Sequence, residues 1–255
     1  MRLATWNLLH GISLSDGQVQ PSRLLEGARA LDADVLGLQE VDRGQPRSAG
    51  RDQTAEVGRA TGAADWRFVP ALVGERGGRW RAADDSDADD ASGLHYGVGL
   101  VTRFPVQAWH VVRLPAAGRR APLLLPGSGR LVWLEDEPRV ALAAVVDTPV
   151  GTMTVATTHL SFLPGWNGAQ LRRVTAALAR LPSPRVLLAD LNMPPPFPRL
   201  LTGWRVLARA ATYPSPRPRV QLDHVLASGS LPDVRAVHTP ALPVSDHRAL
   251  LVELV

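Results

Sequence analysis

An acid and a histidine stand side by side near the end of this chain. Asp246 and His247 lie in the stretch PVSDHRALLVEL, where an apolar strand is predicted to begin. Neighbouring residues of a strand point to opposite faces, so the two side chains do not share one solvated face. The pair either caps a loop or forms one part of an active site. Because the chain has no cysteine, any metal ion there must be held by oxygen or imidazole ligands.

The same pattern recurs along the chain, where acids, amides and histidines begin or end apolar runs. The residues concerned are Asn7, Glu40, Tyr96, His159, Asp190, Asn192 and Asp223. Buried strands carry polar groups only when those groups are paired or bind a ligand. Each residue alone has an ordinary structural explanation, such as a turn cap for Asn7 or an arginine partner for Asp223. As a set they indicate a site, because loops at one edge of a stack of sheets can gather them into one cleft.

Six short motifs occur here in the order found in the endonuclease/exonuclease/phosphatase family, which this chain resembles from residue 3 to residue 255. The motifs are TWN, QEVD, THL, ADLN, LDHVL and SDH. The family includes pancreatic-type deoxyribonucleases, abasic-site endonucleases, neutral sphingomyelinases and inositol polyphosphate 5-phosphatases. The resemblance implies hydrolysis of phosphate esters with a divalent cation. It also implies an α+β fold, a four-layer α/β/β/α sandwich of two mixed β-sheets with helices outside.

The resemblance implies that three residues serve the cation. Glu40 matches the main metal carboxylate of the family, and Asn7 lies beside it to bind metal water or phosphate. Asp246 approaches the same metal. Oxygen ligands suit Mg²⁺ or Mn²⁺. Zn²⁺, with His159 and His247 as ligands, is a weaker alternative.

Four further residues match the catalytic positions of the family. His247 matches the catalytic histidine, and Asp223 matches the carboxylate that fixes its tautomer and favours the imidazolium. Asp190 and Asn192 match the pair that orients the attacking water and holds a non-bridging oxygen. The side chains expected to contact the substrate phosphate are Asn7, Tyr96, Arg139, His159, Asn192 and His247.

His159 matches a second histidine position of the family, where it serves as an acid or a phosphate clamp. Tyr96 is its expected partner, and Arg139 is expected to contact the phosphate. The chain departs from the family pattern at Val98, Ala189 and His224. None of these three positions supplies a central ligand, so we expect a working enzyme.

Periodicity predicts the elements that position these residues. Apolar runs predict strands over residues 3–9, 35–41, 66–73, 95–103, 106–114, 139–147, 151–160, 185–192, 221–228, 234–239 and 247–255. Helical spacing and capping residues predict helices over 21–34, 52–62 and 165–181. Strands outnumber helices, and no repeat or linker is visible. We therefore expect one domain over residues 1–255, with two packed sheets and helices outside.

The stretch 74–93 is predicted to be a long polar loop. Asp85, Asp87 and Asp89 have the alternating spacing of a calcium loop. However, Asp90 stands at the sixth position, where a calcium loop has glycine, and Tyr96 stands at the twelfth in place of glutamate. A flexible, solvated loop is the better interpretation.

The sequence leaves several substrates open, with nucleic acid favoured. Two basic groups form a candidate nucleic-acid rim: Arg76, Arg79, Trp80 and Arg81 in one, Arg119 and Arg120 in the other. A phospholipid or inositol phosphate is the alternative, with apolar tips in PLLLPG and SFLPGW. A non-catalytic module that binds a phosphate ligand is a further alternative.

A stretch near the predicted cleft, QEVDRGQPRSAGRDQ, is expected to be structural. Asp42, Arg43, Arg47 and Asp52 are predicted to form a salt-bridged brace rather than to contact substrate.

Composition limits the partners further. The net charge of +4 comes with 28 basic residues, all arginine, and permits phosphate-bearing partners. No apolar run approaches the roughly 20 residues that span a bilayer. The N-terminus lacks a basic segment followed by an apolar one, so we expect a cytoplasmic monomer.

Overall fold

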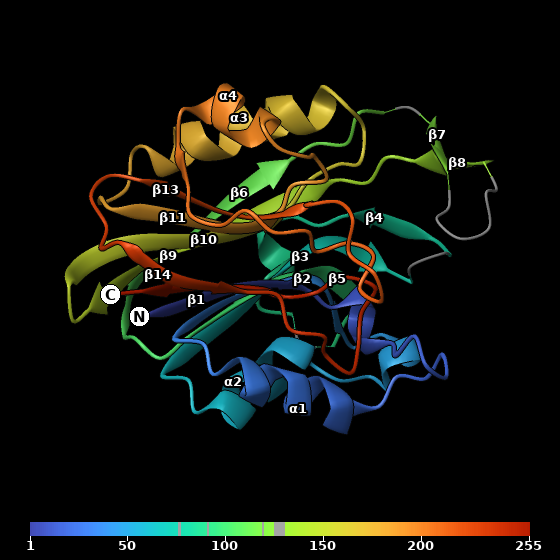
Figure 1. Ribbon diagram of the computed structural model, residues 1–255. Helices are drawn as coiled ribbons and strands as arrows, with labels where there is room; N and C mark the ends of the chain where they lie inside the picture. Colours follow the sequence, from blue (N-terminus) through green and yellow to red (C-terminus); the bar gives the residue numbers. More distant parts are fainter. Residues whose placement is uncertain (76–77, 91, 119, 125–130) are drawn as a thin grey trace.

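Two β-sheets pack face to face at the centre of the protein, and helices cover the outer face of each sheet (Figure 1). The structure is a computed structural model that describes residues 1–75, 78–90, 92–118, 120–124 and 131–255, without the side chains of 120–124, 131–132 and 134. The expected four-layer sandwich is confirmed. Arg76, Arg119 and most of the PLLLPG stretch lie outside the described residues or side chains.

The first sheet has seven strands and one parallel pair, β1 with β2. Its strand order is β14 (Val234–His238), β15 (Leu250–Leu254), β1 (Arg2–Asn7), β2 (Val35–Arg43), β5 (His95–Thr102), β3 (Asp65–Gly74) and β4 (Trp80–Ala82). The remaining neighbours pair antiparallel, so the sheet is mixed.

The second sheet has six strands and is also mixed, because β10 and β11 run parallel. Its order is β12 (Arg205–Val206), β13 (Asp223–Ser228), β11 (Arg185–Asp190), β10 (Gly151–His159), β9 (Arg139–Thr148) and β6 (Val106–Leu114). β7 (Arg120–Leu124) and β8 (Leu131–Glu135) form a separate two-stranded sheet, which projects at one corner of the molecule in Figure 1.

The helices lie in two outer layers. α1 (Pro21–Leu31) and α2 (Gln53–Thr61) cover the first sheet, whereas α3 (Trp166–Leu178) and α4 (Phe197–Thr202) cover the second (Figure 1). Three 3₁₀ turns complete the described elements: η1 (Leu9–Gly11), η2 (Pro46–Ser48) and η3 (Asp85–Asp87). Among the described residues, no helix is long and apolar enough to cross a membrane.

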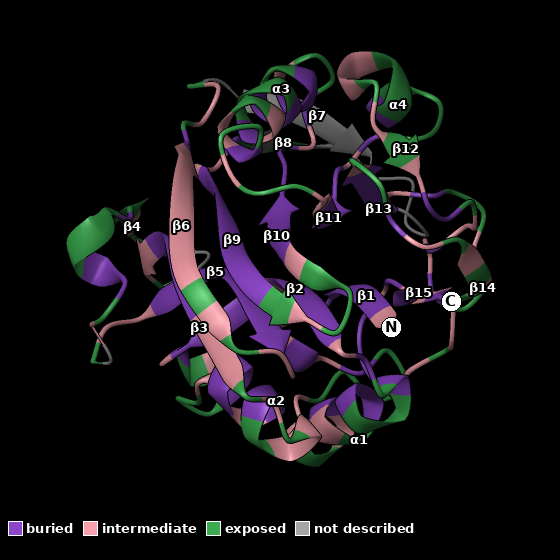
Figure 2. Cartoon of the chain, turned by 90° about the vertical axis from the view of Figure 1, so that its left-hand side faces the viewer, coloured by how far each residue is buried: buried purple, intermediate pink, exposed green. Residues whose placement is uncertain are grey.

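Three apolar clusters fill the spaces between these layers. Val186 and Leu188 of β11 face the cluster between the sheets, whereas Leu187 and Ala189 face the cluster under α3. This alternation follows from the period of two along a strand. The central strands are buried on both faces, as their colouring in Figure 2 shows, which explains their almost continuous apolar sequences.

Local sequence signals place several element ends correctly. Asp52 accepts a hydrogen bond from the backbone of Ala55 at the start of α2, and Gly62 ends this helix with a φ of +67°. Other elements were missed, because strands of two to five residues and a six-residue helix are too short to give clear periodicity. The missed elements are β4, β7, β8, β12 and α4.

The stretch 74–93 is not the flexible, solvated loop that its sequence suggests. Its described residues contain β4 and η3, and Arg43 and Arg113 tie them to the rest of the protein. Buried Arg43 donates to the backbone oxygens of Asp87, Ala88 and Asp90, at 3.0, 3.1 and 2.6 Å. The guanidinium supplies the positive charge and the donors that satisfy these oxygens.

Candidate active site

Most of the polar residues predicted from the sequence gather at one edge of the two sheets. The edge is the one toward which β1 runs, opposite the chain termini in Figure 1. The parallel pairs β1–β2 and β10–β11 both end here, in the registers Asn7↔Gln39 and His159↔Asp190. The carboxyl ends of parallel strands from two packed sheets therefore place their side chains together.

Asn7 joins the two sheets at this edge. Its side-chain amide donates to Glu40 Oε1 at 3.1 Å within the first sheet and to Asp190 Oδ2 at 2.9 Å in the second. Its own Oδ1 accepts the backbone N–H of Leu9 at 3.0 Å, which fixes the orientation of the amide. The buried Asn7 side chain is thus saturated on both ends and holds two carboxylates in place.

A bulge aims Glu40 into the site. The pairing of β2 with β5 shifts register between Leu38 and Val41, and Glu40 has a φ of +53°. An inserted residue in a strand re-aims the side chain next to it, and a non-glycine residue at positive φ is strained. The surrounding contacts must outweigh that strain.

Asp190, Asn192 and His159 form a second group, on the second sheet. Asp190 Oδ1 accepts the backbone N–H of Asn192 at 3.0 Å, and Asn192 has a φ of +50°. The Asn192 amide lies 3.0 Å from Nε2 of His159 and also donates to the oxygen of Leu160 at 3.0 Å. The turn after β11 therefore brings both of its polar residues to the end of β10.

Arg139 approaches the other side of His159. One of its guanidinium nitrogens lies 3.3 Å from Nδ1 of His159, and another lies 3.7 Å from the carboxylate of Glu137. Arg139 and the Asn192 amide both face a ring nitrogen as donors, so the ring is neutral and accepts from one of the two. Arg139 is buried and contacts His159, and its contact with phosphate stays a prediction.

His247 and Asp223 form a close pair across the two sheets. Nδ1 of His247 lies 2.9 Å from Asp223 Oδ2 and 3.8 Å from Asp190 Oδ2. Ser245, with a φ of +81°, anchors the loop: its hydroxyl donates to the Asn7 oxygen at 2.6 Å and accepts the backbone N–H of His247 at 3.0 Å. These bonds fix the imidazole at the edge of the cleft.

Nearby carboxylates shift the pKa values of both Asp246 and His247. Burial alone lowers the pKa of His247, but the charges of Asp223 and Asp190 outweigh it and raise the pKa to about 10. Burial raises the pKa of Asp246 to about 6, a shift that His247 opposes and that Glu40 and Asp190 reinforce. Several negative charges thus repel one another in a small volume.

A divalent cation fits this cluster. Asp190, Asp223 and His247 offer ligand atoms that lie within 4.8 Å of one another, and buried Asp223 Oδ1 has no hydrogen-bond partner among the described residues. Nδ1 of His247 is already bonded to Asp223, so a cation fits better beside Glu40 and Asp246, two carboxylates that lie close enough to influence one another. When bound, such a cation neutralises phosphate charge and polarises the ester.

Tyr96 and the predicted brace lie beside the site. Asp42 is fully buried and binds Arg47 through two nitrogens, at 2.7 and 2.8 Å. The Arg47 guanidinium lies 5.6 Å above the Tyr96 ring, which packs into the core between the sheets. Asp42 and Arg47 therefore brace one another, as expected, whereas Arg43 holds the η3 segment and Asp52 caps α2. The pairing of Tyr96 with His159 stays a prediction.

One aromatic residue of the site was missed in the sequence. The ring of Tyr213 lies 4.8 Å from the imidazole of His247, at an interplanar angle of 48°. Burial raises the pKa of Tyr213, and the carboxylates of Asp246, Asp190 and Glu40 add to the shift, so its hydroxyl shares their surroundings. Tyr213 stands in the proline-rich stretch TYPSPRP between predicted strands, where periodicity gives no signal.

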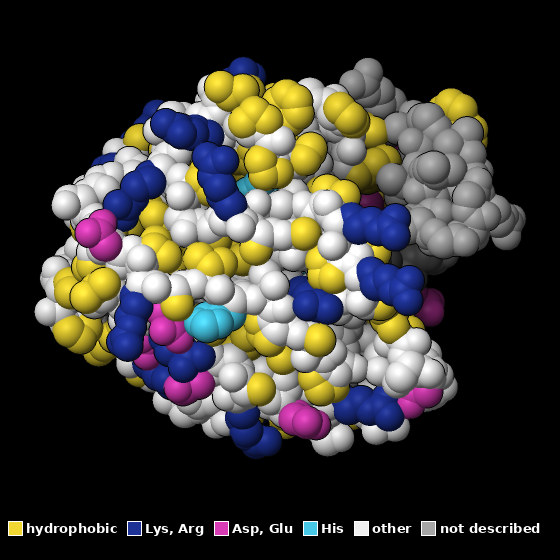
Figure 3. Space-filling view, in the orientation of Figure 1, with side chains coloured by type: hydrophobic (Ala, Val, Ile, Leu, Met, Phe, Trp, Pro, Cys, Tyr) yellow, Lys and Arg dark blue, Asp and Glu magenta, His cyan; other side chains and the backbone are white. Residues whose placement is uncertain are grey.

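The candidate nucleic-acid rim is weaker than the sequence suggests. Arg81 is engaged by Asp87 at 2.6 Å, and Trp80 packs against the core between the sheets. Arg76 and Arg119 lie outside the described residues, as does the side chain of Arg120. Basic side chains are nevertheless visible along the edge that carries the site in Figure 3.

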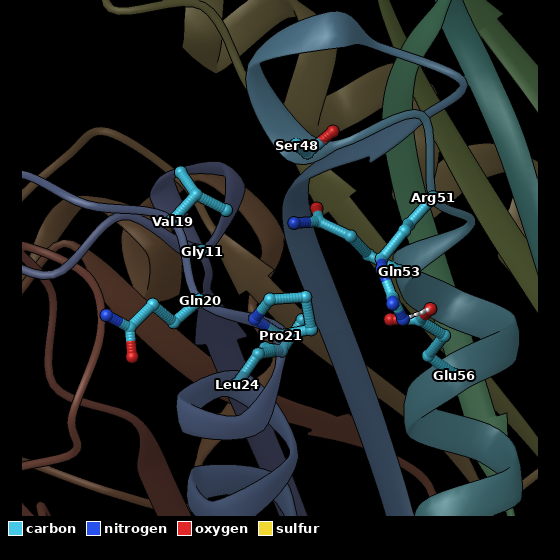
Figure 4. A pocket seen from close by; sticks show the side chains of 9 residues that line it. All are labelled: Gly11, Val19, Gln20, Pro21, Leu24, Ser48, Arg51, Gln53 and Glu56. Carbon is cyan, nitrogen blue, oxygen red and sulfur yellow. Dashed lines mark hydrogen bonds and ion pairs between the residues drawn. The ribbon is translucent and has the colours of Figure 1, made fainter.

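A small cavity near η1 is separate from this site. It measures about 10 Å³ and lies between the start of α1 and the start of α2, lined by residues that include Gly11, Leu24 and Gln53 (Figure 4). That volume holds about one water molecule. Gln53 crosses it to donate to the oxygen of His10 at 2.7 Å, and the cavity is therefore a structural gap and not a ligand site.

Comparison with known proteins identifies the family of this chain. The sequence model of the Endonuclease/Exonuclease/phosphatase family matches residues 4–247. The chain belongs to this family. None of the curated proteins compared with the chain matches it.

Solved structures of the family share the fold. The endonuclease/exonuclease/phosphatase of Beutenbergia cavernae is 26% identical, with a TM-score of 0.70 over 99% of this chain and 70% of that chain. The mannosyl-6-phosphatase of Bacteroides thetaiotaomicron is 17% identical, with a TM-score of 0.62 over 100% and 99%. Sphingomyelinase C of Streptomyces griseocarneus is 14% identical, with a TM-score of 0.60 over 100% and 99%. Family members are phosphoester hydrolases, and a hydrolytic role on a phosphoester is therefore supported.

Proposed function

We propose that this chain is a phosphoesterase that requires Mg²⁺ or Mn²⁺ and hydrolyses phosphodiester bonds by attack of water. The observation that carries the proposal is the His247–Asp223 pair, 2.9 Å apart, beside a cluster of three further acids. Attack of water on phosphorus needs charge neutralisation, a group that handles protons and donors for the phosphate oxygens. The site offers all three within one cleft edge.

The residues for the cation are Glu40, Asn7 and Asp246, as the family resemblance implies. Asn7 contributes by orienting two carboxylates, since its amide bonds both Glu40 and Asp190. Oxygen donors at this density favour a hard cation over Zn²⁺. Burial is the main cause of the raised pKa of Asp246, and the cation would offset the smaller contribution from the charges of Glu40 and Asp190.

The proton-handling residues are His247, with Asp223, and Asp190, with Asn192. Asp223 accepts from Nδ1 of His247, so this bond fixes the tautomer and leaves Nε2 to exchange a proton or to donate to the phosphate. Asp190 is proposed to orient water through Oδ2, which also accepts from Asn7. Its other oxygen, Oδ1, accepts the backbone N–H of Asn192, whose amide is proposed to donate to a non-bridging oxygen.

His159 and Arg139 are proposed to position the phosphate. Donor groups of Arg139 and Asn192 face the two ring nitrogens of His159, and a protonated ring can accept from neither. His159 therefore serves better as a neutral positioning group than as the acid that protonates the leaving group. Arg139 adds a buried positive charge behind it.

Nucleic acid remains the first substrate to test, although the rim described above no longer singles it out. A phospholipid is favoured by one observation: Phe197 and Leu200 of α4 and Trp133 of β8 are exposed large hydrophobic residues on the side of the second sheet. Inositol phosphates and other small phosphate esters are further candidates.

The first experiment measures hydrolysis of bis-p-nitrophenyl phosphate and p-nitrophenyl phosphate with Mg²⁺, Mn²⁺ or EDTA. We expect metal-dependent cleavage of the diester and no cleavage in EDTA. Cleavage of the monoester alone would replace the phosphodiesterase with a phosphatase. DNA, RNA, phospholipid and inositol phosphate panels then rank the natural substrates.

Matched variants separate an enzyme from a non-catalytic binding module. Glu40→Gln and His247→Gln are expected to lower the rate by about 10²–10⁴-fold, because each removes a group that acts on the reacting phosphate. The controls are Glu26→Gln, on the exposed face of α1, and His238→Gln, half exposed on β14. Equal rates in all four variants would show that the site lies elsewhere.

A further inference from the structure

A cavity of about 420 Å³ lies next to the loop that carries Asp246 and His247. The residues of its lining that carry polar or charged groups are Ser13, Ser15, Arg23, Ser215, Ser245 and Arg248. This volume falls within the roughly 300–1,000 Å³ of small-molecule sites. The cavity is therefore large enough for one phosphorylated sugar or nucleoside unit.

The cavity shares its wall with the candidate active site. Ser245 lies between the two, since its hydroxyl bonds the backbone of both Asn7 and His247, at 2.6 and 3.0 Å. On the other side, the backbone N–H of Ser215 donates to the oxygen of Asp246 at 2.6 Å. A ligand in the cavity is thus separated from the metal and histidine residues by one loop.

The charge on this wall is positive. Arg23 is neutralised by Asp16 at 2.8 Å. Arg248 is half-buried and donates only to backbone oxygens, to Ser215 at 2.8 Å and Thr239 at 3.4 Å. No carboxylate of the described residues lies within ion-pair distance of it. Arginine has five N–H donors, so several stay available for an anion.

The anion site depends mainly on the guanidinium of Arg248, because most of the serine hydroxyls are already bonded. The Ser13 hydroxyl donates to the oxygen of Pro243 at 2.8 Å and accepts from the Ser15 hydroxyl at 3.0 Å. Leu14 and Leu242 supply apolar surface to the lining. An uncompensated guanidinium matches a phosphate group, and the apolar residues match the carbon frame that bears it.

We propose that this cavity binds a second phosphate of the substrate, while the first is hydrolysed at the candidate active site. The inference rests on the proposed function and narrows it to esters that carry two phosphates. Such a phosphate comes either from a nucleotide chain or from a small bisphosphate, because both present the same group to Arg248.

Substrate pairs that differ by one phosphate test the proposal. The nucleotide pair is the p-nitrophenyl ester of thymidine 5′-phosphate with and without a 3′-phosphate. The small-molecule pair is glycerophosphoinositol 4-phosphate and glycerophosphoinositol, which are both phosphodiesters and differ by one phosphate. We expect the second phosphate to raise kcat/KM at least about tenfold in one pair, which identifies its source. A ratio near one in both pairs would overturn the proposal.

Variants connect this preference to the cavity. Leu14→Glu places a carboxylate on the lining at a residue that is 51% exposed, so folding should persist. Leu14→Glu is expected to lower the ratio of kcat/KM with and without the second phosphate to about one. Leu14→Gln, which adds no charge, is expected to keep the wild-type ratio. Arg248→Gln is expected to act like Leu14→Glu, and Arg172→Gln, on the exposed face of α3, to act like wild type. A Leu14→Glu enzyme that kept its preference would contradict the proposal.

Binding of inorganic phosphate gives a readout without catalysis. Calorimetry is done in EDTA, where the acidic cluster of the active site repels anions. We expect wild type and Leu14→Gln to bind phosphate and Leu14→Glu to bind at least about tenfold more weakly. Equal binding in both variants rejects the cavity as an anion site. Binding that depends on residue 14, in a protein that hydrolyses no ester, upholds the cavity and rejects the proposed function.

Discussion

Asp223 and His247 lie 2.9 Å apart although they belong to different sheets. Asp223 begins β13 of the second sheet, and His247 precedes β15 of the first. Asn7 and Asp190 cross the same gap at 2.9 Å. The site is therefore assembled by the packing of one sheet on the other, and its geometry depends on their relative position.

Replacing Asp223 with asparagine should impair catalysis more than substrate binding. The amide would keep the hydrogen-bonding shape of the carboxylate, but it would no longer favour the imidazolium or fix the tautomer of His247. We expect kcat to fall about 10²–10⁴-fold with KM nearly unchanged. Steady-state kinetics on the diester measure both constants. Asp233→Asn, an exposed acid near β14, is the control and should leave kcat unchanged.

The metal-free protein should keep His247 protonated at neutral pH. Its pKa in the folded protein, about 10, lies above the unfolded value of 6.5. The pairing therefore stabilises the fold fully below about pH 6.5, and this contribution is lost as the pH rises toward 10. The difference in free energy of unfolding between wild type and Asp223→Asn should shrink over that window, as urea denaturation can measure. A difference that grew with pH would contradict this assignment.

The ring and the hydroxyl of Tyr213 should have separate effects on catalysis. The ring packs on His247 at 4.8 Å, and the hydroxyl shares the surroundings of Asp246 and Glu40. Tyr213→Phe keeps the ring, so we expect only a small fall in kcat. Tyr213→Ala removes the ring, so His247 loses its packing. We expect kcat to fall about tenfold or more and the pH profile of kcat to broaden. If Phe and Ala behaved alike, the ring would have no positioning role.

Gln39 should stabilise the sheet packing beneath the site. Its amide donates to Thr157 of the second sheet at 2.8 Å and accepts from Thr5 of the first at 3.1 Å. Gln39→Leu leaves these buried hydroxyls without a partner, which costs about 1–3 kcal/mol each. Chemical denaturation should show a loss of this size. Gln107→Leu, whose amide bonds only the exposed Asp147, is the control and should change stability by less than about 0.5 kcal/mol.

Much of this protein can be predicted from its sequence. Apolar runs predict the long strands, because β1, β2, β10 and β11 are buried on both faces and most of their side chains are apolar or threonine. Capping residues mark the ends of α2 for a local reason, since Asp52 and Gly62 act within one turn. Polar residues at strand ends indicate the site, because burying them unpaired is unfavourable.

Contacts between segments that are distant in sequence could be seen only in the tertiary structure. Which strand ends meet depends on sheet order and register, so the contact of Asp223 with His247 has no local signal. Tyr213 joins the site through a proline-rich segment without periodicity. Arg43 and Arg113 hold the polar stretch around η3 in place through contacts distant in sequence. These features arise from packing between layers, whose energy depends on partners that no single segment contains.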